Sequence, residues 1–402
     1  MSDMNTVSLL NLPVEILHRI IDYLDTSTIL LSVSNVCVYL RAISTTYNRY
    51  QLNLTSFSKW HFHRICLLLE PMNILSLTLS DDNTTPGQIR LFLSLFNIDQ
   101  FTRLRSLTLL GIDDKDLCKV LQSDITSTLT FLAIHWREAH CPTVESMNLL
   151  SSLLHRLSLE KLELKTSSYA LEEMLWPIQC TLTHLTLMYA TQKQYCRILR
   201  QTPNLKMLIL NHCSMHKMEE QIVTVSDPIF CEQFKSLVLI DSRMSIVGLI
   251  SILSLTPWLT YLKIICSPDP FDTIADGSRW EKFIRTNLPF LHKFEFFFTN
   301  IYNVYYNLRD IRTVISRFQT PFWLEEKHWF VTCDYINYLN QVMLYTTPLC
   351  NTDFTFECEA NKISYSNILT AVTNDSTITD NVQTINLTLT KLLAGVSSMK
   401  VG

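Results

Sequence analysis

Two short stretches of this 402-residue chain gather side chains that could bind a metal ion. One is HWREAHC at residues 135–141, which lacks the His-Glu-x-x-His order of helical zinc sites and follows an expected strand. The other places His212 and Cys213 close to His216, but Cys213 also falls at a position that a repeating pattern reserves for small inward residues. We therefore expect no metal ion and no other cofactor.

Phosphate-binding and nucleophilic motifs are missing from the sequence as well. Its six glycines stand far apart, whereas a phosphate-binding loop needs several close together so that backbone N–H groups can reach the ligand. No Gly-x-Ser-x-Gly elbow, which would expose a serine nucleophile, occurs in the sequence. We expect a protein that binds other molecules without catalysing a reaction.

Composition and charge restrict the class of protein further. With 47% hydrophobic and 17% charged residues, the chain is expected to be a folded protein. The net charge is −4 and no basic run is present, so nucleic acid is not an expected partner. No window approaches the roughly 20 apolar residues of a membrane helix, so no membrane association is expected. Because the first residues lack a basic leader, we expect a cytoplasmic or nuclear protein with reduced cysteines.

The central part of the chain is built from one recurring pattern, L-x-x-L-x-L with conservative replacements. The starts of the pattern are spaced 23 to 32 residues apart, which brackets the roughly 20 to 29 residues of leucine-rich repeats. The nine copies start at Met72, Leu104, Leu129, Leu159, Leu182, Leu205, Phe234, Leu259 and Leu291. Internal repetition of this kind predicts a stack of similar units.

Each unit is expected to be a short strand followed by a helix. The stretch that follows Thr85 begins with a proline in the first helical turn, as helix starts prefer. Five consecutive units carry a small residue at the ninth motif position, namely Ser167, Ala190, Cys213, Ser242 and Ser267. We predict an α/β fold in which residues 50–310 form a leucine-rich-repeat solenoid, a curved parallel sheet with outer helices.

The regular spacing of the leucine motif is interrupted in the aromatic-rich segment of residues 311–402. Residues 322–335 and 341–347 are predicted to be two strands of a hairpin, and residues 382–389 are predicted to form a last repeat. We expect this segment to cap the solenoid, because the last unit of a repeat array must cover an otherwise open end.

Apolar residues occupy two faces of the stretch LPVEILHRIIDYLD at residues 12–25. Pro13 suits the first turn of a helix, and Glu15 meets the positive end of the helix dipole. The two apolar stripes lie about 100° apart on a helix. One contains Ile16, Ile20 and Leu24, and the other contains Leu17, Ile21 and again Leu24. A unit this small cannot cover both stripes by itself, so one is predicted to stay open for a partner.

Residues 11–47 resemble the F-box, the three-helix motif that links variable receptors to the Skp adaptor of cullin-based ubiquitin ligases. The resemblance rests on Leu12, Pro13, Glu15, Ile16, Leu17, Ile20, Tyr23, Leu24, Asp25, Ile29, Leu30, Val36, Cys37, Leu40, Arg41 and Ile43. The sequence departs from the motif near Tyr39 and Leu40, where many relatives carry a tryptophan, so the packing of the third helix is in doubt. The repeats behind it resemble the leucine-rich-repeat branch of the same family.

Motif and repeats together predict a flexible N-terminus (1–10), a three-helix F-box (11–49), the solenoid (50–310) and the C-terminal segment (311–402). The resemblance implies that F-box side chains bind the Skp adaptor and, through it, a cullin. The expected adaptor-binding residues are Leu12, Pro13, Ile16, Ile20, Leu24, Ile29, Leu30, Val36 and Cys37.

A protein substrate is expected on the concave face of the solenoid, where residues between and just after the leucines point. The later repeats are apolar there, and the predicted contact residues are Ile209, Ile240, Ile265 and Phe297. This organisation predicts a substrate receptor of a Skp–cullin–F-box ubiquitin ligase, with ubiquitin transferred by a separate enzyme. The alternative is a ligase-independent leucine-rich-repeat scaffold that uses the same surfaces.

Overall fold

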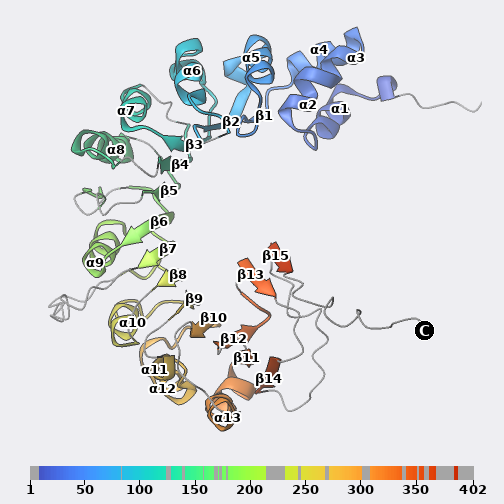
Figure 1. Cartoon of the computed structure of the whole chain (residues 1–402). Coiled ribbons are helices and arrows are strands. Elements are labelled where there is room, and N and C mark those ends of the chain that lie inside the picture. Colours follow the sequence, from blue (N-terminus) through green and yellow to red (C-terminus); the bar gives the residue numbers. More distant parts are fainter. Residues whose placement is uncertain are drawn as a thin grey trace, which may run out of the picture. The chain divides into compact units, whose positions relative to one another are not determined.

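The structure is a computed structural model, drawn as a ribbon in Figure 1. It describes residues 9–82, 84–123, 128–137, 141–156, 158–166, 171, 174–177, 180–213, 231–242, 246–267, 271–300, 308–336, 341–350, 353–356, 362–367 and 384–387. The chain forms two compact units. The first comprises residues 1–189 with 201–204, and the second comprises residues 190–200 with 205–402.

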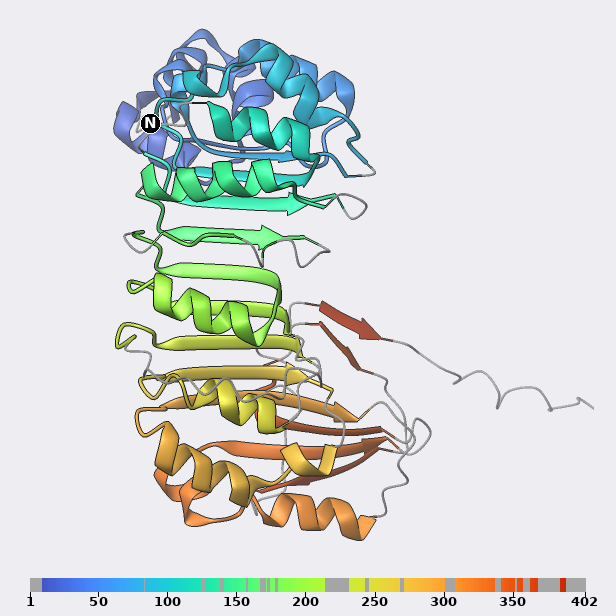
Figure 2. The ribbon, with the colours of Figure 1, turned by 90° about the vertical axis from the view of Figure 1, so that its left-hand side faces the viewer.

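Parallel strands in chain order form the sheet of the first unit. Their bounds are β1 Tyr50–Asn53, β2 Ile74–Ser80, β3 Ser106–Ile112, β4 Phe131–Trp136, β5 Lys161–Lys165 and β6 His184–Ala190. Equivalent leucines lie side by side, so that Leu107 of β3 pairs with Leu132 of β4. Both side chains are fully buried. This register is that of stacked repeats, and Figure 2 shows the strands running side by side in one direction.

The first predicted copy of the motif, starting at Met72, is placed two residues too early. Leu77 of β2 lies beside Leu107 of β3, which makes Ile74 the first apolar residue of this copy. Ile74 is fully buried, whereas Met72 is 61% exposed in a short turn before the strand. The stretch MNILSLTLS contains overlapping apolar positions, and only the pairing with β3 selects the frame.

Helices follow the strands of the first unit, and α6, α7 and α8 lie on one side of its sheet (Figure 1). The helices of this unit are α1 Val14–Ile21, α2 Thr26–Thr28, α3 Ser34–Val36, α4 Val38–Thr46, α5 Lys59–Leu68, α6 Gln88–Leu95, α7 Asp114–Gln122 and α8 Val144–Arg156. Helices α5 and α6 pack on one another through aromatic rings. The ring of Phe62 in α5 lies edge-on to that of Phe92 in α6, with 6.4 Å between centroids.

Threonine side chains join neighbouring repeats where the strands begin. Oγ1 of Thr130 donates a hydrogen bond to the carbonyl oxygen of Arg105 at 3.2 Å. Thr183 does the same to the carbonyl oxygen of Glu160 at 3.0 Å. They add to the backbone hydrogen bonds that the same carbonyl oxygens accept, such as that from the N–H of Phe131 to the oxygen of Arg105 at 2.9 Å.

The second unit also contains parallel strands, in the order β7 to β10. Their bounds are β7 Met207–Cys213, β8 Ser236–Ser242, β9 Tyr261–Cys266 and β10 Lys293–Asn300. Its helices are α9 Gln192–Gln201, α10 Ile246–Leu253, α11 Phe271–Ile274, α12 Gly277–Asn287 and α13 Leu308–Ser316. With β2 to β6 of the first unit, each of the nine predicted copies supplies one strand, so the fold is a leucine-rich-repeat solenoid.

The small residue predicted at the ninth position of each motif has different surroundings in different repeats. Ala190 is fully buried, whereas Ser267 is half-buried and its hydroxyl lies 2.7 Å from that of Thr299. Ser167 lies outside the described residues, and so do the side-chain environments of Cys213 and Ser242.

A hairpin changes the direction of the strands after β10. Strands β11 Phe330–Ile336 and β12 Gln341–Thr347 pair antiparallel, β12 pairs antiparallel with β10, and β14 Lys362–Ser366 pairs antiparallel with β11. The strand predicted over residues 322–335 begins only at Phe330, because Phe322–Glu326 form a helical turn. That turn buries Trp323, whose indole N–H donates to the carbonyl oxygen of Gly277 at 3.3 Å.

Strands β13 Asp353–Phe356 and β15 Thr384–Leu387 form a separate parallel pair. The predicted last repeat at residues 382–389 contains β15, and its remaining residues lie outside the described ones. Within the described ranges, every helix is too short or too polar to cross a membrane.

Candidate functional site

Helix α1 divides its two apolar stripes between the interior and the surface. Leu17 and Ile21 are 2% and 4% exposed, whereas Ile16 and Ile20 are 40% and 39% exposed. Leu24, which follows the helix, is 38% exposed. Leu17 and Ile21 therefore support the fold, while Ile16, Ile20 and Leu24, called here the outer stripe, offer an apolar surface.

The start of α1 follows from the chemistry of proline. Pro13 occupies the N-cap position with extended backbone, and its carbonyl oxygen accepts hydrogen bonds from the N–H groups of Ile16 and Leu17 at 3.0 and 3.1 Å. No intrahelical partner exists for an N–H at this position, so proline loses nothing there. Leu12 is half-buried and Pro13 is exposed.

Asp25 fixes the turn that carries Leu24. Its carboxylate accepts hydrogen bonds from the hydroxyl of Ser27, from the N–H of Thr28 at 2.9 Å and from Oγ1 of Thr28 at 2.6 Å. These bonds, that from Ser27 above all, lower the pKa of Asp25 to about 2. Asp25 is therefore the N-cap of α2, the helix that begins two residues after Leu24.

The junction between α3 and α4 presents two valines to solvent. Cys37 is the N-cap of α4, and its Sγ accepts the N–H of Leu40 at 3.4 Å. On either side of Cys37, Val36 is 70% exposed and Val38 is 81% exposed. The half-buried Cys37 therefore positions two exposed apolar residues at the start of α4.

Two residues of the expected adaptor set belong to the interior instead. Ile29 and Leu30 are 1% and 8% exposed, because the turn that contains them packs into the N-terminal helices. Both pack inward in the chain alone, and Leu30 lines a pocket, so their direct contact with an adaptor stays a prediction.

Three exposed side chains of this surface were missed by sequence reasoning. Tyr23 is 92% exposed beside Leu24, and Val38 and Tyr39 are 81% and 40% exposed directly after Cys37. The available signal was their adjacency in the sequence to Leu24 and Cys37, two expected members of the adaptor set.

The predicted substrate residues lie on neighbouring strands of the second unit. Ile240 of β8 pairs in register with Ile265 of β9, which pairs with Phe297 of β10. Ile209 lies on β7, beside Val238. Ile209, Ile240 and Ile265 are half-buried, so part of each side chain remains accessible.

Phe297 is not available to a substrate, which corrects the sequence-based expectation. It is 5% exposed and packs in a cluster with Tyr345, Leu349 and Cys350. The rings of Phe297 and Tyr345 are stacked at 6.0 Å. Ile265 packs against the same cluster. The strand and turn that follow the repeats therefore cover this end of the predicted surface.

The histidine-rich stretches are only partly described. His135 lies on β4, where its Nε2 is 2.9 Å from Oε1 of Glu163 on β5. That contact and the ammonium of Lys165 at 3.1 Å lower the pKa of Glu163 to about 2. Among the described residues, no three potential ligands of the His, Cys, Asp or Glu type converge as a metal site.

Comparisons with known proteins support one part of this picture. Residues 9–50 match the F-box-like family. A search of curated proteins finds no matching relative. Among solved structures, the chain is similar to an internalin, inlF, from Listeria monocytogenes str. 4b F2365, with 13% sequence identity and a TM-score of 0.29. That similarity covers 56% of this chain and 74% of the internalin. The chain combines an F-box-like region with the parallel strands and helices of its repeats.

Proposed function

We propose that this chain is the substrate-recognition subunit of a Skp–cullin–F-box ubiquitin ligase, acting in the cytoplasm or nucleus. The observation that carries the proposal is the outer stripe: Ile16, Ile20 and Leu24 stay exposed although Leu17 and Ile21 of the same stretch are buried. The match of residues 9–50 to the F-box-like family supports a Skp-type adaptor as the partner of this stripe.

The amount of exposed apolar surface is consistent with a protein partner. Completing the burial of one outer-stripe side chain would contribute roughly 0.5–1 kcal/mol, and that of Val36 or Val38 roughly 1–2 kcal/mol. A micromolar complex requires about 8 kcal/mol. The outer stripe and both valines together supply roughly 3.5–7 kcal/mol, so an adaptor that binds with micromolar affinity must make further contacts beyond these five side chains.

The solenoid would act by holding a protein substrate at a fixed place. A substrate bound to the strands shares one complex with the ubiquitin carrier, which raises the effective concentration of its lysines near the reactive group. Ile209, Ile240 and the accessible part of Ile265 are the proposed contact residues. A tight complex is not required, because transfer takes place within the assembly.

Copurification tests the proposal. The chain with Ile16→Asp and Leu24→Asp should lose the Skp-type adaptor and the cullin, because each change places a charge in an apolar contact. The matched control is Val247→Asp, a 66% exposed position on α10 that should leave recovery unchanged. If the double variant retained the same partners as the native chain, the result would favour the ligase-independent scaffold.

A further inference from the structure

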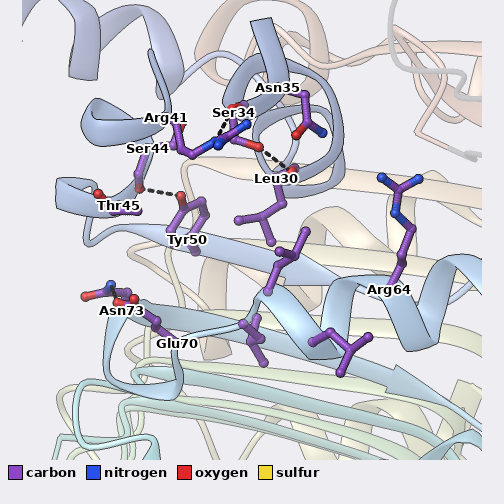
Figure 3. A pocket seen from close by; sticks show the side chains of 13 residues that line it. Leu30, Ser34, Asn35, Arg41, Ser44, Thr45, Tyr50, Arg64, Glu70 and Asn73 are labelled. Atoms are coloured by element: carbon purple, nitrogen blue, oxygen red, sulfur yellow. Dashed lines mark hydrogen bonds between the residues drawn. The ribbon is translucent and has the colours of Figure 1, made fainter. Parts of the chain in front are cut away.

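A pocket of about 500 Å³ lies in the first unit, between the N-terminal helices and helix α5 (Figure 3). Its upper wall includes Leu30, Ser34 and Arg41, and its lower wall includes Arg64 and Leu67 of α5. The volume falls within the roughly 300–1,000 Å³ of pockets that enclose ligand groups. None of these residues except Leu30 and Arg41 belongs to the F-box resemblance.

Two arginines face the pocket from opposite walls. Nε of Arg41 donates to the carbonyl oxygen of Ser34 at 3.0 Å, and the guanidinium of Arg64 lies 5.0 Å from the ring centroid of Trp60. Both contacts hold the guanidinium planes and leave N–H donors free for an anion. Within the part of the chain that the structure describes, neither arginine forms an ion pair.

The lower wall is apolar and unusually exposed for a repeat helix. Leu67 and Leu68 are 72% and 47% exposed, and Trp60, which contacts Arg64 without lining the pocket, is 61% exposed. On the outer helices of a solenoid such positions normally carry polar side chains, and a contiguous exposed apolar patch marks an interaction surface. The pocket thus combines an apolar wall with two cations at its rim.

We propose that this pocket is a second docking site, separate from the outer stripe, which binds an acidic peptide segment carrying one bulky apolar side chain. The peptide carboxylates lie against Arg41 and Arg64, and the apolar side chain packs on Leu67 and Leu68. Charge complementarity selects this occupant, because an apolar ligand without an anion would leave both guanidiniums facing a covered surface without a partner.

Glu70 also lines the pocket and disfavours an acidic residue beside it. Its Oε2 accepts a hydrogen bond from Nδ2 of Asn73 at 2.8 Å. A backbone N–H or a basic side chain satisfies Glu70 better than a second acid does. The acidic residues of the peptide therefore lie against the two arginines and away from Glu70.

Fluorescence anisotropy with synthetic peptides on the full chain tests this site. The probe is fluorescein-labelled Gly-Ser-Asp-Glu-Leu-Phe-Gly-Ser. The two comparison peptides replace Asp-Glu with Lys-Lys or Leu-Phe with Ala-Ala. We expect the probe to bind at least about tenfold more tightly than either comparison peptide, and its affinity to fall with added salt.

Variants assign the binding to the pocket. Arg64→Glu and Leu67→Asp should each weaken the probe about tenfold, whereas Arg103→Glu, an exposed position elsewhere in the unit, should not. Because Arg64 and Leu67 are exposed, these variants should fold, which circular dichroism checks. The Ile16→Asp and Leu24→Asp chain should keep the probe while losing the adaptor, so the two proposals fail independently.

Three results would overturn the docking site. One is equal affinity for the three peptides, and another is unchanged affinity in both pocket variants. The third is full displacement of the probe by a purified Skp-type adaptor, which would assign the pocket to the adaptor interface instead of to a separate peptide.

Discussion

The hydroxyl of Tyr47 donates a hydrogen bond to Oδ1 of Asp22 at 2.8 Å, which joins the end of α1 to the end of α4. Arg49 pairs with the other oxygen of the same carboxylate at 3.0 Å. Burial, assisted by Asp22, raises the pKa of Tyr47 to about 12. The hydrogen bond that links α1 to α4 therefore requires the neutral, protonated form of the Tyr47 phenol.

Replacing Tyr47 with Phe should lower the free energy of unfolding by about 1 kcal/mol at neutral pH, because Asp22 loses a hydrogen bond. In the unfolded chain the phenol ionises at about pH 10, whereas in the folded chain it stays protonated to a higher pH. The native chain should therefore lose stability as the pH rises from 10 towards 12. Tyr47→Phe should lose less over this range. Urea midpoints against pH measure both effects, with Tyr23→Phe as an exposed control; parallel curves for native chain and variant would contradict the assignment.

Gly111 should be far less replaceable than Gly87. Both have positive φ, at 67° and 78°, but a Cβ at Gly111 would lie 3.2 Å from the backbone of Asp81, whereas one at Gly87 meets nothing within 4 Å. Alanine should cost about 1 kcal/mol at Gly87 from backbone strain alone, and about 2–3 kcal/mol at Gly111. Thermal unfolding of the two variants measures the difference, and equal costs would show that the contact with Asp81 relaxes freely.

Phe297→Ala should destabilise the second unit by about 3–5 kcal/mol, because it leaves a cavity under Tyr345 and Leu349. Phe290→Ala removes the same side chain from a 45% exposed position and should cost about 1 kcal/mol or less. Chemical denaturation of both variants gives the comparison. A small effect at Phe297 would mean that the cover over the strand is loose and that the residue could reach a substrate after all.

Glu163 should make the first unit more stable above its unfolded pKa than below it. Its folded pKa is held at about 2 by His135 and then Lys165, compared with an ordinary value near 4.5. Stability from this pairing is therefore complete above pH 4.5 and is lost as the pH falls towards 2. Glu163→Gln should reduce this loss of stability at acidic pH, while Glu160→Gln should leave it unchanged. Denaturation midpoints at several pH values test it, and an unchanged limb in Glu163→Gln would refute the pairing.

The spacing of leucines in the sequence was sufficient to predict the repeats, but it did not fix the first residue of every copy of the motif. Leucines spaced by two and three residues identify strands wherever one frame fits, as at Leu104 or Leu182. Around Met72 two frames fit equally well, and pairing with β3 decides between them. Strand pairing is a long-range relationship, so a single repeat read in isolation cannot supply it.

The candidate binding surfaces could likewise be predicted only in part from the sequence. The two stripes of α1 could be read from helix geometry, and the structure exposes Ile16 and Ile20. The burial of Leu30 and Phe297 could not be read, because the residues that cover them come from other parts of the chain. Exposure depends on contacts between distant segments, which neither periodicity nor residue type encodes.

The antiparallel pairing of β12 with β10 limits how this protein can change in length. A leucine-rich unit added directly after β10 would need the strand edge that β12 now occupies. A unit inserted between β2 and β9 would meet parallel neighbours on both sides and keep every terminal contact intact. Duplication during evolution, or deliberate lengthening by design, is therefore expected to be tolerated inside the array and rejected at its hairpin end.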